Sequence, residues 1–311
     1  MDLSTFLIQC LNSLQYGLLL FLVASGLTLI FGIMGVINLA HGSFYMIGAY
    51  MAYALAPFVA GTFGGGFFAV LAVGLVLAVL LGYLLEWAFF SFLYEREHLQ
   101  QVLMTYGLIL VFEELRSILV GDDVYGVKAP EILSGTLPLG DVMTYPVYRL
   151  FISGVCVLLA LGMYFVFTRT RLGMMIRAGS TNREMVQSLG IDIKFLYRVV
   201  FAAGVAIAVL AGMVAAPVSS VYPGMGNTVL IICFVVVVIG GIGSIRGALV
   251  GAVLVGVVDT IGRAFLPILF GLFFQPRVAS AAGPAIASVM IYLLMAVVLF
   301  FRPKGLFPAR G

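Results

Sequence analysis

Charged side chains inside long apolar stretches are the residues of this sequence with the clearest chemical potential. Glu113 and Arg116 are three residues apart, and Asp259 and Arg263 are four apart, so each pair shares one face of a helix. Ionisable groups in such stretches form proton relays, polar linings or ion pairs. We expect Asp259 and Arg263 to form a self-neutralising structural pair. Glu113 and the adjacent Glu114 are candidates for a polar lining or for contacts between helices, and proton coupling is the alternative.

A second group of polar residues interrupts the apolar sequence early in the chain. It contains Asn38, His41 and Gly42, and Tyr45 follows. Polar groups in this setting need partners or water. The stretch therefore predicts either a bend that lines a transport path or a cytoplasmic turn after which a helix restarts at Gly42. A metal site at His41 is not expected, because the one other histidine, His98, has no companion ligands near it.

Glycines late in the chain form two patterns. The run Gly240-Gly241-Ile242-Gly243 should break a helix, because glycine is the poorest helix former after proline. A break at membrane depth is tolerated only where protein or a water-filled cavity surrounds it, so Gly241 and Gly243 are further candidates for the path. Gly243, Gly247 and Gly251 repeat every four residues, which favours close packing between helices.

The longest polar stretch of the chain predicts a short amphipathic helix. Met185, Val186 and Leu189 are spaced to give that helix an apolar stripe, Asn182 could cap it, and Gly190 could end it. The pattern favours, about equally, a helix that docks a cytoplasmic protein and a helix that lies among lipid headgroups. The candidate docking residues are Arg177, Asn182, Arg183, Glu184, Met185, Val186, Leu189, Gly190 and Ile191.

The composition identifies the medium in which these elements must lie. Of the 311 residues, 63% are apolar and 9% are charged, whereas soluble domains have about 45–50% and about 25%. This excludes a soluble protein, and it also excludes a disordered one. Unbroken apolar runs such as 229–242 exclude the alternation of a β-barrel, and the scattered basic residues form no nucleic-acid surface. We expect an all-α, polytopic membrane protein with a single domain over 1–311.

Apolar runs predict nine membrane-spanning helices. The second is weak because the stretch before it is broken or re-entrant, so the expected number is eight to nine. The predicted spans are 10–34, 43–60, 67–92, 101–119, 148–168, 195–216, 226–242, 247–269 and 285–301.

The distribution of basic residues predicts the orientation. The segment 169–198 carries six basic and two acidic residues, so it is expected in the cytoplasm. The tail is expected there too, because it carries Arg302, Lys304 and Arg310. The segment 120–147 is expected outside, since it carries Asp122, Asp123, Glu131 and Asp141 against Lys128. Nine spans connect these assignments and place the N-terminus outside.

The sequence offers little for enzyme chemistry. It contains no G-x-x-x-x-G-K-[ST] phosphate loop, no H-E-x-x-H and no Ser-His-Asp arrangement. The short loops leave no room for a soluble catalytic domain. We therefore expect no catalytic residue, no metal and no cofactor, and any ATP would be bound by another chain.

Four segments, in this order, resemble the bacterial branched-chain amino acid ABC transporter permeases of the LivH type. Val186 departs from the pattern, because the family has a small alanine at that point of its coupling segment. The segments are Gly26–Tyr50, Ser188–Ile191, Gly240–Ala252 and Phe301–Phe307.

The resemblance implies a type II-like ABC importer permease with a cytoplasmic coupling helix in the segment 169–198. It implies a second permease subunit, expected to be a different chain, and two ATP-binding subunits docked on the coupling segments. A periplasmic binding protein would deliver branched-chain amino acids for import across the bacterial inner membrane.

Three alternatives remain open. The first is a permease of the same family for urea, short amides or other hydrophobic amino acids, because such permeases have similar sequences. A secondary transporter driven by an ion gradient would need a titratable centre at the membrane midplane, for which Glu113 and Glu114 are the candidates. A non-transporting assembly protein is the third alternative.

Overall fold

The computed structural model describes residues 3–63, 66–94, 96–138 and 144–307, so Asp141 and Arg310 lie outside the described residues. The regular secondary structure of the described residues is helical apart from two three-residue strands, which confirms the all-α expectation. The α-helices are α1 (Leu3–Met34), α2 (His41–Phe63), α3 (Phe67–Ala88), α4 (His98–Val120), α5 (Val147–Arg169), α6 (Arg171–Thr181), α7 (Arg183–Ser188), α8 (Ile193–Ala215), α9 (Met225–Gly240), α10 (Ile245–Phe270) and α11 (Pro276–Phe301). Two single-turn 3-10 helices, η1 (Phe90–Phe92) and η2 (Glu131–Leu133), and the antiparallel strands β1 (Thr136–Pro138) and β2 (Thr144–Pro146) complete it.

Each of the nine expected spans coincides with a helix, but the nine helices are not equivalent. Among the described residues, seven helices are long and apolar enough to cross a membrane: α1, α2, α3, α5, α8, α10 and α11. The helix α9 has 16 residues and reaches about 24 Å, less than the roughly 30 Å of a hydrocarbon core. The helix α4 is long enough, but it carries Glu113, Glu114 and Arg116.

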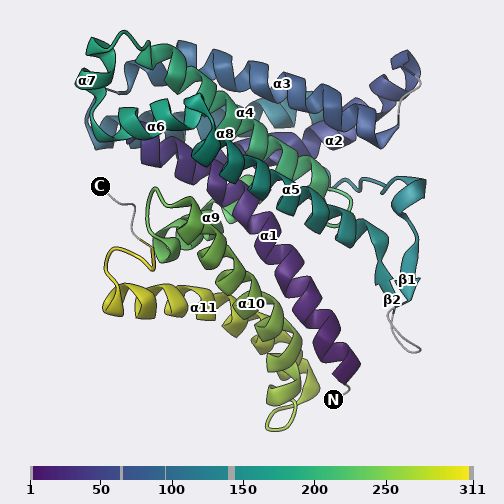
Figure 1. Cartoon of the computed structure of the whole chain (residues 1–311). Helices are drawn as coiled ribbons and strands as arrows, with labels where there is room; N and C mark the ends of the chain where they lie inside the picture. The colour runs from purple at the N-terminus through teal and green to yellow at the C-terminus, as the bar shows by residue number, and fades with distance from the viewer. Residues whose placement is uncertain (1–2, 64–65, 95, 139–143, 308–311) are drawn as a thin grey trace.

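The helix α1 runs through the middle of the molecule and joins two groups of helices (Figure 1). On one side it contacts α10, which also packs against α9 and α11; on the other it contacts α8, which packs against α2 and α3. The helix α8 is enclosed by its neighbours, because residues on all its faces are buried. Apart from Tyr197 and Phe201 near its start, small and β-branched residues dominate this helix, so its neighbours approach closely.

Small residues make the closest of these contacts. A side chain at Gly247 would collide with the carbonyl of Gly240 on α9, and one at Gly251 would lie 2.6 Å from the carbonyl oxygen of Val236 on the same helix. Backbones therefore touch where the sequence has glycine, as helices in lipid require. This confirms the packing role predicted for the four-residue glycine repeat.

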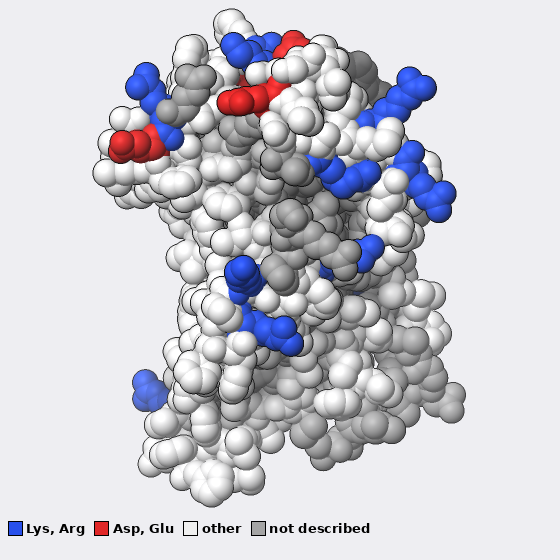
Figure 2. Space-filling view, turned by 60° about the vertical axis from the view of Figure 1, so that its left-hand side comes forward, with Lys and Arg blue, Asp and Glu red and all other residues white. Residues whose placement is uncertain are grey.

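The two short helices α6 and α7 lie at one end of the molecule, and the N-terminus lies at the other (Figure 1). They join the last turn of α5 to the first turn of α8, so they mark the end where those two turns lie. We call this the α6–α7 end. In Figure 2, the acidic side chains and several basic ones lie in the upper part of the molecule, at the height of α6 and α7 in Figure 1. Further basic side chains continue down past the middle of this face.

Candidate functional site

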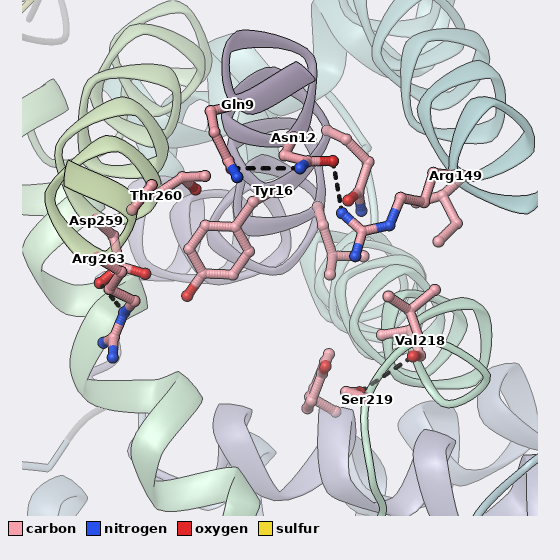
Figure 3. Close-up of a pocket in the computed structure, with 15 residues that line it drawn as sticks. Gln9, Asn12, Tyr16, Arg149, Val218, Ser219, Asp259, Thr260 and Arg263 are labelled. Carbon is pink, nitrogen blue, oxygen red and sulfur yellow. Dashed lines mark hydrogen bonds and ion pairs between the residues drawn. The ribbon is translucent and has the colours of Figure 1, made fainter. Parts of the chain in front are cut away.

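An open cavity of about 470 Å³ lies at the end of the molecule opposite α6 and α7. Its walls come from the first half of α1, the first turns of α5, the end of α8 with the residues that follow it, and the second half of α10, with Tyr45 of α2 (Figure 3). We call this the cavity end. The lining residues combine amides, phenols and charges with an apolar part: Gln9, Asn12, Gln15, Tyr16, Leu19, Tyr45, Arg149, Ile152, Ala215, Val218, Ser219, Asp259, Thr260, Arg263 and Ala264.

Charged groups occupy two opposite walls of this cavity (Figure 3). On α10, Arg263 Nε donates to Asp259 Oδ1 at 2.7 Å, which confirms the predicted structural pair. On α5, Arg149 Nη1 donates to Asn12 Oδ1 at 2.6 Å. Tyr16 projects into the space between the two walls (Figure 3).

The cavity ends at Tyr45, which is 5% exposed. Near it, His41 is fully buried and its Nε2 lies 2.9 Å from the carbonyl of Val23. Val23 precedes the end of α1 by eleven residues, or about 16 Å along the helix axis. The chain after α1 therefore folds back along α1, and α2 begins at His41, one residue before the restart that the sequence analysis allowed.

This re-entrant stretch, residues 35–40, contains buried polar groups without protein partners. Asn38 is fully buried, and its Oδ1 accepts a hydrogen bond from Ala40 N at 3.0 Å. Within the part of the chain that the structure describes, Asn38 Nδ2 and His41 Nδ1 have no partner. Gly42 lies against Gly226 of α9 and leaves no space for a side chain.

Two residues of α4 that the sequence analysis missed hold this stretch in place. Gln101 is 3% exposed, and its Oε1 accepts a hydrogen bond from Ile37 N at 3.4 Å. Its Nε2 donates to the carbonyls of Leu93 and Arg96. Thr105, one turn later, is fully buried beside it. Their four-residue spacing within an apolar helix was the available signal, because it places both on one buried face.

The other proposed path residues do not line the 470 Å³ cavity. Gly241, with φ of +104°, ends α9 as expected and packs against Lys304 and Phe307 of the tail. Gly243 lies against Gly32 at the end of α1. The late glycine motif and the tail motif therefore form one packing unit.

The carboxylates of α4 lie apart from the cavity. Arg116 binds Glu113 at 3.3 Å and Asp122 at 2.9 Å, and Glu114 is exposed. The hydrogen bond from Arg116 holds the pKa of the Asp122 carboxyl below its usual range, and Ser117 adds to this effect. Among the described residues, Glu113 is thus part of an ion-pair cluster near the chain that follows α4.

The predicted docking segment is built as two helices. Asn182 Oδ1 accepts a hydrogen bond from Met185 N at 3.0 Å, and Gly190 follows α7 with φ of +82°, so both predicted ends are confirmed. The predicted apolar stripe is wrong in one member, because Val186 is 3% exposed and faces the core. Met185 and Leu189 are 62% and 75% exposed. The reason is that Val186 is about 100° from Met185 around a helix, so it lies at one edge of the stripe, and tertiary packing turns that edge toward the core.

The remaining docking candidates surround this helix. Glu184 is exposed, and the Ile191 amide donates to the carbonyl of Val186, which closes the segment behind α7. On α6, Arg177 donates to the carbonyl of Phe167 at the end of α5. The Arg183 side chain lies outside the described part of the structure.

A buried ion pair fixes the first turns of α8 beside this segment. Glu86 of α3 is fully buried and accepts hydrogen bonds from Arg198 Nε at 3.1 Å and from Tyr94 at 2.5 Å. The sequence shows Glu86 as one more charge late in a span, without indicating its partner.

These features define a multi-pass membrane protein built as a transport subunit, with a polar cavity at one end and a short helical segment at the other. The family described as the permease component of the branched-chain amino acid transport system matches residues 9–299. The chain belongs to this family, whose members are transporter subunits and not enzymes.

Curated relatives match over nearly their whole length. The permease protein BraD of a high-affinity branched-chain amino acid transport system, from Pseudomonas aeruginosa, is 28% identical over 97% of this chain and 95% of its own. The permease protein LivH of Escherichia coli K12 is 26% identical with the same coverage. A probable LivH of Methanocaldococcus jannaschii is 26% identical over 95% of this chain and 90% of its own. No solved structure matches the chain significantly.

Proposed function

We propose that this chain is the membrane-spanning subunit of an ABC importer and that it moves branched-chain amino acids into the cytoplasm. The observation that carries the proposal is the family match, which covers residues 9–299. Relatives from two bacteria and an archaeon bear the names of branched-chain amino acid permeases. The mixed polar and apolar lining of the cavity suits a substrate with a charged backbone and a hydrocarbon side chain.

The two ends of the molecule suit different partners. The basic segment 169–198 supports a cytoplasmic α6–α7 end, where ATP-binding subunits would dock on the exposed Met185 and Leu189. This orientation puts the cavity end and the N-terminus outside the cell, in reach of a substrate-binding protein. A second permease chain, the same or different, would complete the pathway in the bacterial inner membrane.

Within this chain, the path would run from the cavity past Tyr45 to the re-entrant stretch with Asn38 and His41. Their unpartnered nitrogen atoms offer hydrogen bonds at a depth where the bilayer offers none. In this arrangement Gly42, Gly241 and Gly243 act through close helix packing beside the path.

The test begins with purification of the chain from its native membrane in mild detergent, together with the protein subunits that remain bound to it. The purified complex is reconstituted into vesicles, and uptake of labelled leucine is measured with and without ATP. We expect uptake that needs ATP, that excess valine and isoleucine inhibit, and that a proton ionophore leaves intact. Competition by urea or acetamide would instead identify another substrate class.

A secondary transporter would behave differently in the same assay. Leucine uptake would then persist without ATP, collapse with the ionophore, and be lost in the double variant Glu113→Gln and Glu114→Gln. That result would overturn the proposal, whereas unchanged ATP-driven uptake in the double variant supports it.

A further inference from the structure

The charges in the wall of the 470 Å³ cavity are unequally compensated. Asp259 and Arg263 neutralise one another, but Arg149 has no carboxylate within ion-pair distance in the described residues. Its partners there are neutral groups, the amide of Asn12 and the phenol of Tyr145. The wall on α5 therefore presents an uncompensated guanidinium, which is a binding group for a carboxylate.

A second polar group in the cavity lacks a partner. Gln15 is 6% exposed and lines the cavity, and among the described residues its amide has no hydrogen-bond partner. Because Gln15 faces an open cavity, its amide is available to exchange hydrogen bonds with water for hydrogen bonds with a ligand.

The opposite wall offers an acceptor for a cation. Asp259 Oδ1 accepts a hydrogen bond from Arg263, and Asp259 is 6% exposed. Tyr16 stands between this carboxylate and Arg149 (Figure 3). Leu19, Ile152 and Ala215 supply apolar surface to the same cavity.

We propose that this cavity binds the zwitterion of an aliphatic α-amino acid on its way through the protein. Arg149 binds the carboxylate, Asp259 and Gln15 receive the ammonium group, and the apolar part of the wall contacts the side chain. The site rests on the proposed function, because it is the entry point of the same pathway. It adds to that function a recognition of the amino acid backbone by the permease itself.

The test measures protection of a cysteine in the cavity within the purified complex. Ser219 is exposed and lines the cavity, so Ser219→Cys is labelled with a polar maleimide. Cys10 is first changed to serine, while Cys156 and Cys233 are buried and remain. Ser220→Cys is the matched control, because Ser220 is the exposed neighbour that does not line the cavity. The probes are leucine, leucinamide, which lacks the carboxylate, and 4-methylpentanoate, which lacks the ammonium group.

We expect leucine to slow labelling at position 219 and to leave position 220 unaffected. Leucinamide and 4-methylpentanoate should need concentrations about tenfold higher or more, because each loses one charge-assisted contact. Arg149→Gln should raise the protecting concentration of leucine about tenfold and change that of leucinamide little. Arg277→Gln, an exposed arginine at the start of α11 outside the cavity, should change neither.

Failure of the site and failure of the proposed function give different results. Equal protection by leucine and leucinamide, or no protection, in a complex that imports leucine with ATP would overturn the site alone. Zwitterion-selective protection in a complex without ATP-driven leucine uptake would support the site and overturn the proposed function. If Arg149→Gln does not assemble, the three probes on the unchanged cavity still decide the question.

Discussion

The two ends of the molecule differ in how far their charged side chains are buried and paired. At the α6–α7 end, the side chain of Glu86 is 0% exposed and pairs with Arg198, which is 24% exposed. At the cavity end, the carboxylates of Asp122 and Asp259 belong to pairs in which one partner is 71% or 46% exposed, and Arg149 has a neutral partner. A buried, fully bonded pair holds helices in one arrangement, whereas open and incompletely paired charges leave room for a ligand.

This difference fits the work proposed for each end. Arg198 belongs to the second turn of α8, directly after the α7 segment. Its bond to Glu86 ties that turn to α3, and the contact between Phe90 and Phe201, with ring centroids 4.3 Å apart, lies beside it. Movement of α7 would therefore be passed to α3 and α8 together. Among the described ion pairs of the cavity end, the most buried one joins Glu113 and Arg116, with side chains 22% and 9% exposed. Both residues lie on α4, so this pair links no two helices.

The largest effect is expected from breaking the buried pair. Glu86→Gln should lower the free energy of unfolding by about 3 kcal/mol, the low end of the range for buried pairs, because Arg198 keeps some contact with solvent. Thermal unfolding of the complex in detergent measures this change. Glu97→Gln, at an exposed position directly before α4 and outside the docking segment, is the control and should leave stability unchanged. Equal stability of both variants would contradict the buried link.

The second prediction compares backbone packing at the two ends. Gly247→Ala should cost about 1–3 kcal/mol, because the new methyl group collides with the Gly240 carbonyl and forces α9 and α10 apart. Gly126→Ala, in the loop near the cavity end, meets nothing within 4 Å and should be neutral or slightly stabilising. Unfolding measurements on both variants test this difference. An unchanged free energy of unfolding in Gly247→Ala would contradict it.

The third prediction concerns the turn after α7. Gly190 has φ of +82°, a value that proline excludes and that asparagine tolerates. Gly190→Pro should therefore displace Leu189 and Ile191 and leave ATP hydrolysis running with reduced leucine uptake. Gly190→Asn should keep both activities, because asparagine adopts this φ without the backbone strain, of the order of 1–3 kcal/mol, that the proline variant would carry. Normal uptake per ATP in the proline variant would show that this turn takes no part in coupling.

The sequence predicts most of the fold because apolar length and glycine position determine it locally. All nine expected spans have helices, and the break at Gly241 and the caps at Asn182 and Gly190 follow from the conformations these residues favour. The pair Asp259–Arg263 is also predictable, since both residues lie on one helix. Val186 is the exception among local features, because tertiary burial decides which face of α7 points inward.

The cavity could not be predicted, because its residues meet only in the tertiary structure. Arg149 and Asn12 are bonded across 137 positions of sequence, and Arg198 and Glu86 across 112. No spacing rule connects such pairs in a single sequence. Glu113 and Glu114, which stood out as charges in an apolar stretch, have not been tested as path residues and lie outside the cavity lining.

The smallest effect is expected at the exposed pair near the cavity end, and it should depend on pH. Arg116 lowers the pKa of Asp122 in the folded state, so the pair stabilises the fold above the ordinary aspartate pKa of about 4 and loses this contribution as the pH falls through the folded value. Asp122→Asn should lower the melting temperature slightly at pH 7 and low salt. The difference from the unchanged protein should shrink as the pH falls through the lowered pKa of Asp122, and it should also shrink in high salt. Asp123→Asn, its exposed neighbour without an ion pair in the described residues, should show neither dependence. A loss of stability at Asp122 as large as that at Glu86 would mean that both ends hold their charged pairs equally firmly. The difference in charge pairing would then not support ligand binding at the cavity end and transmission of movement at the α6–α7 end.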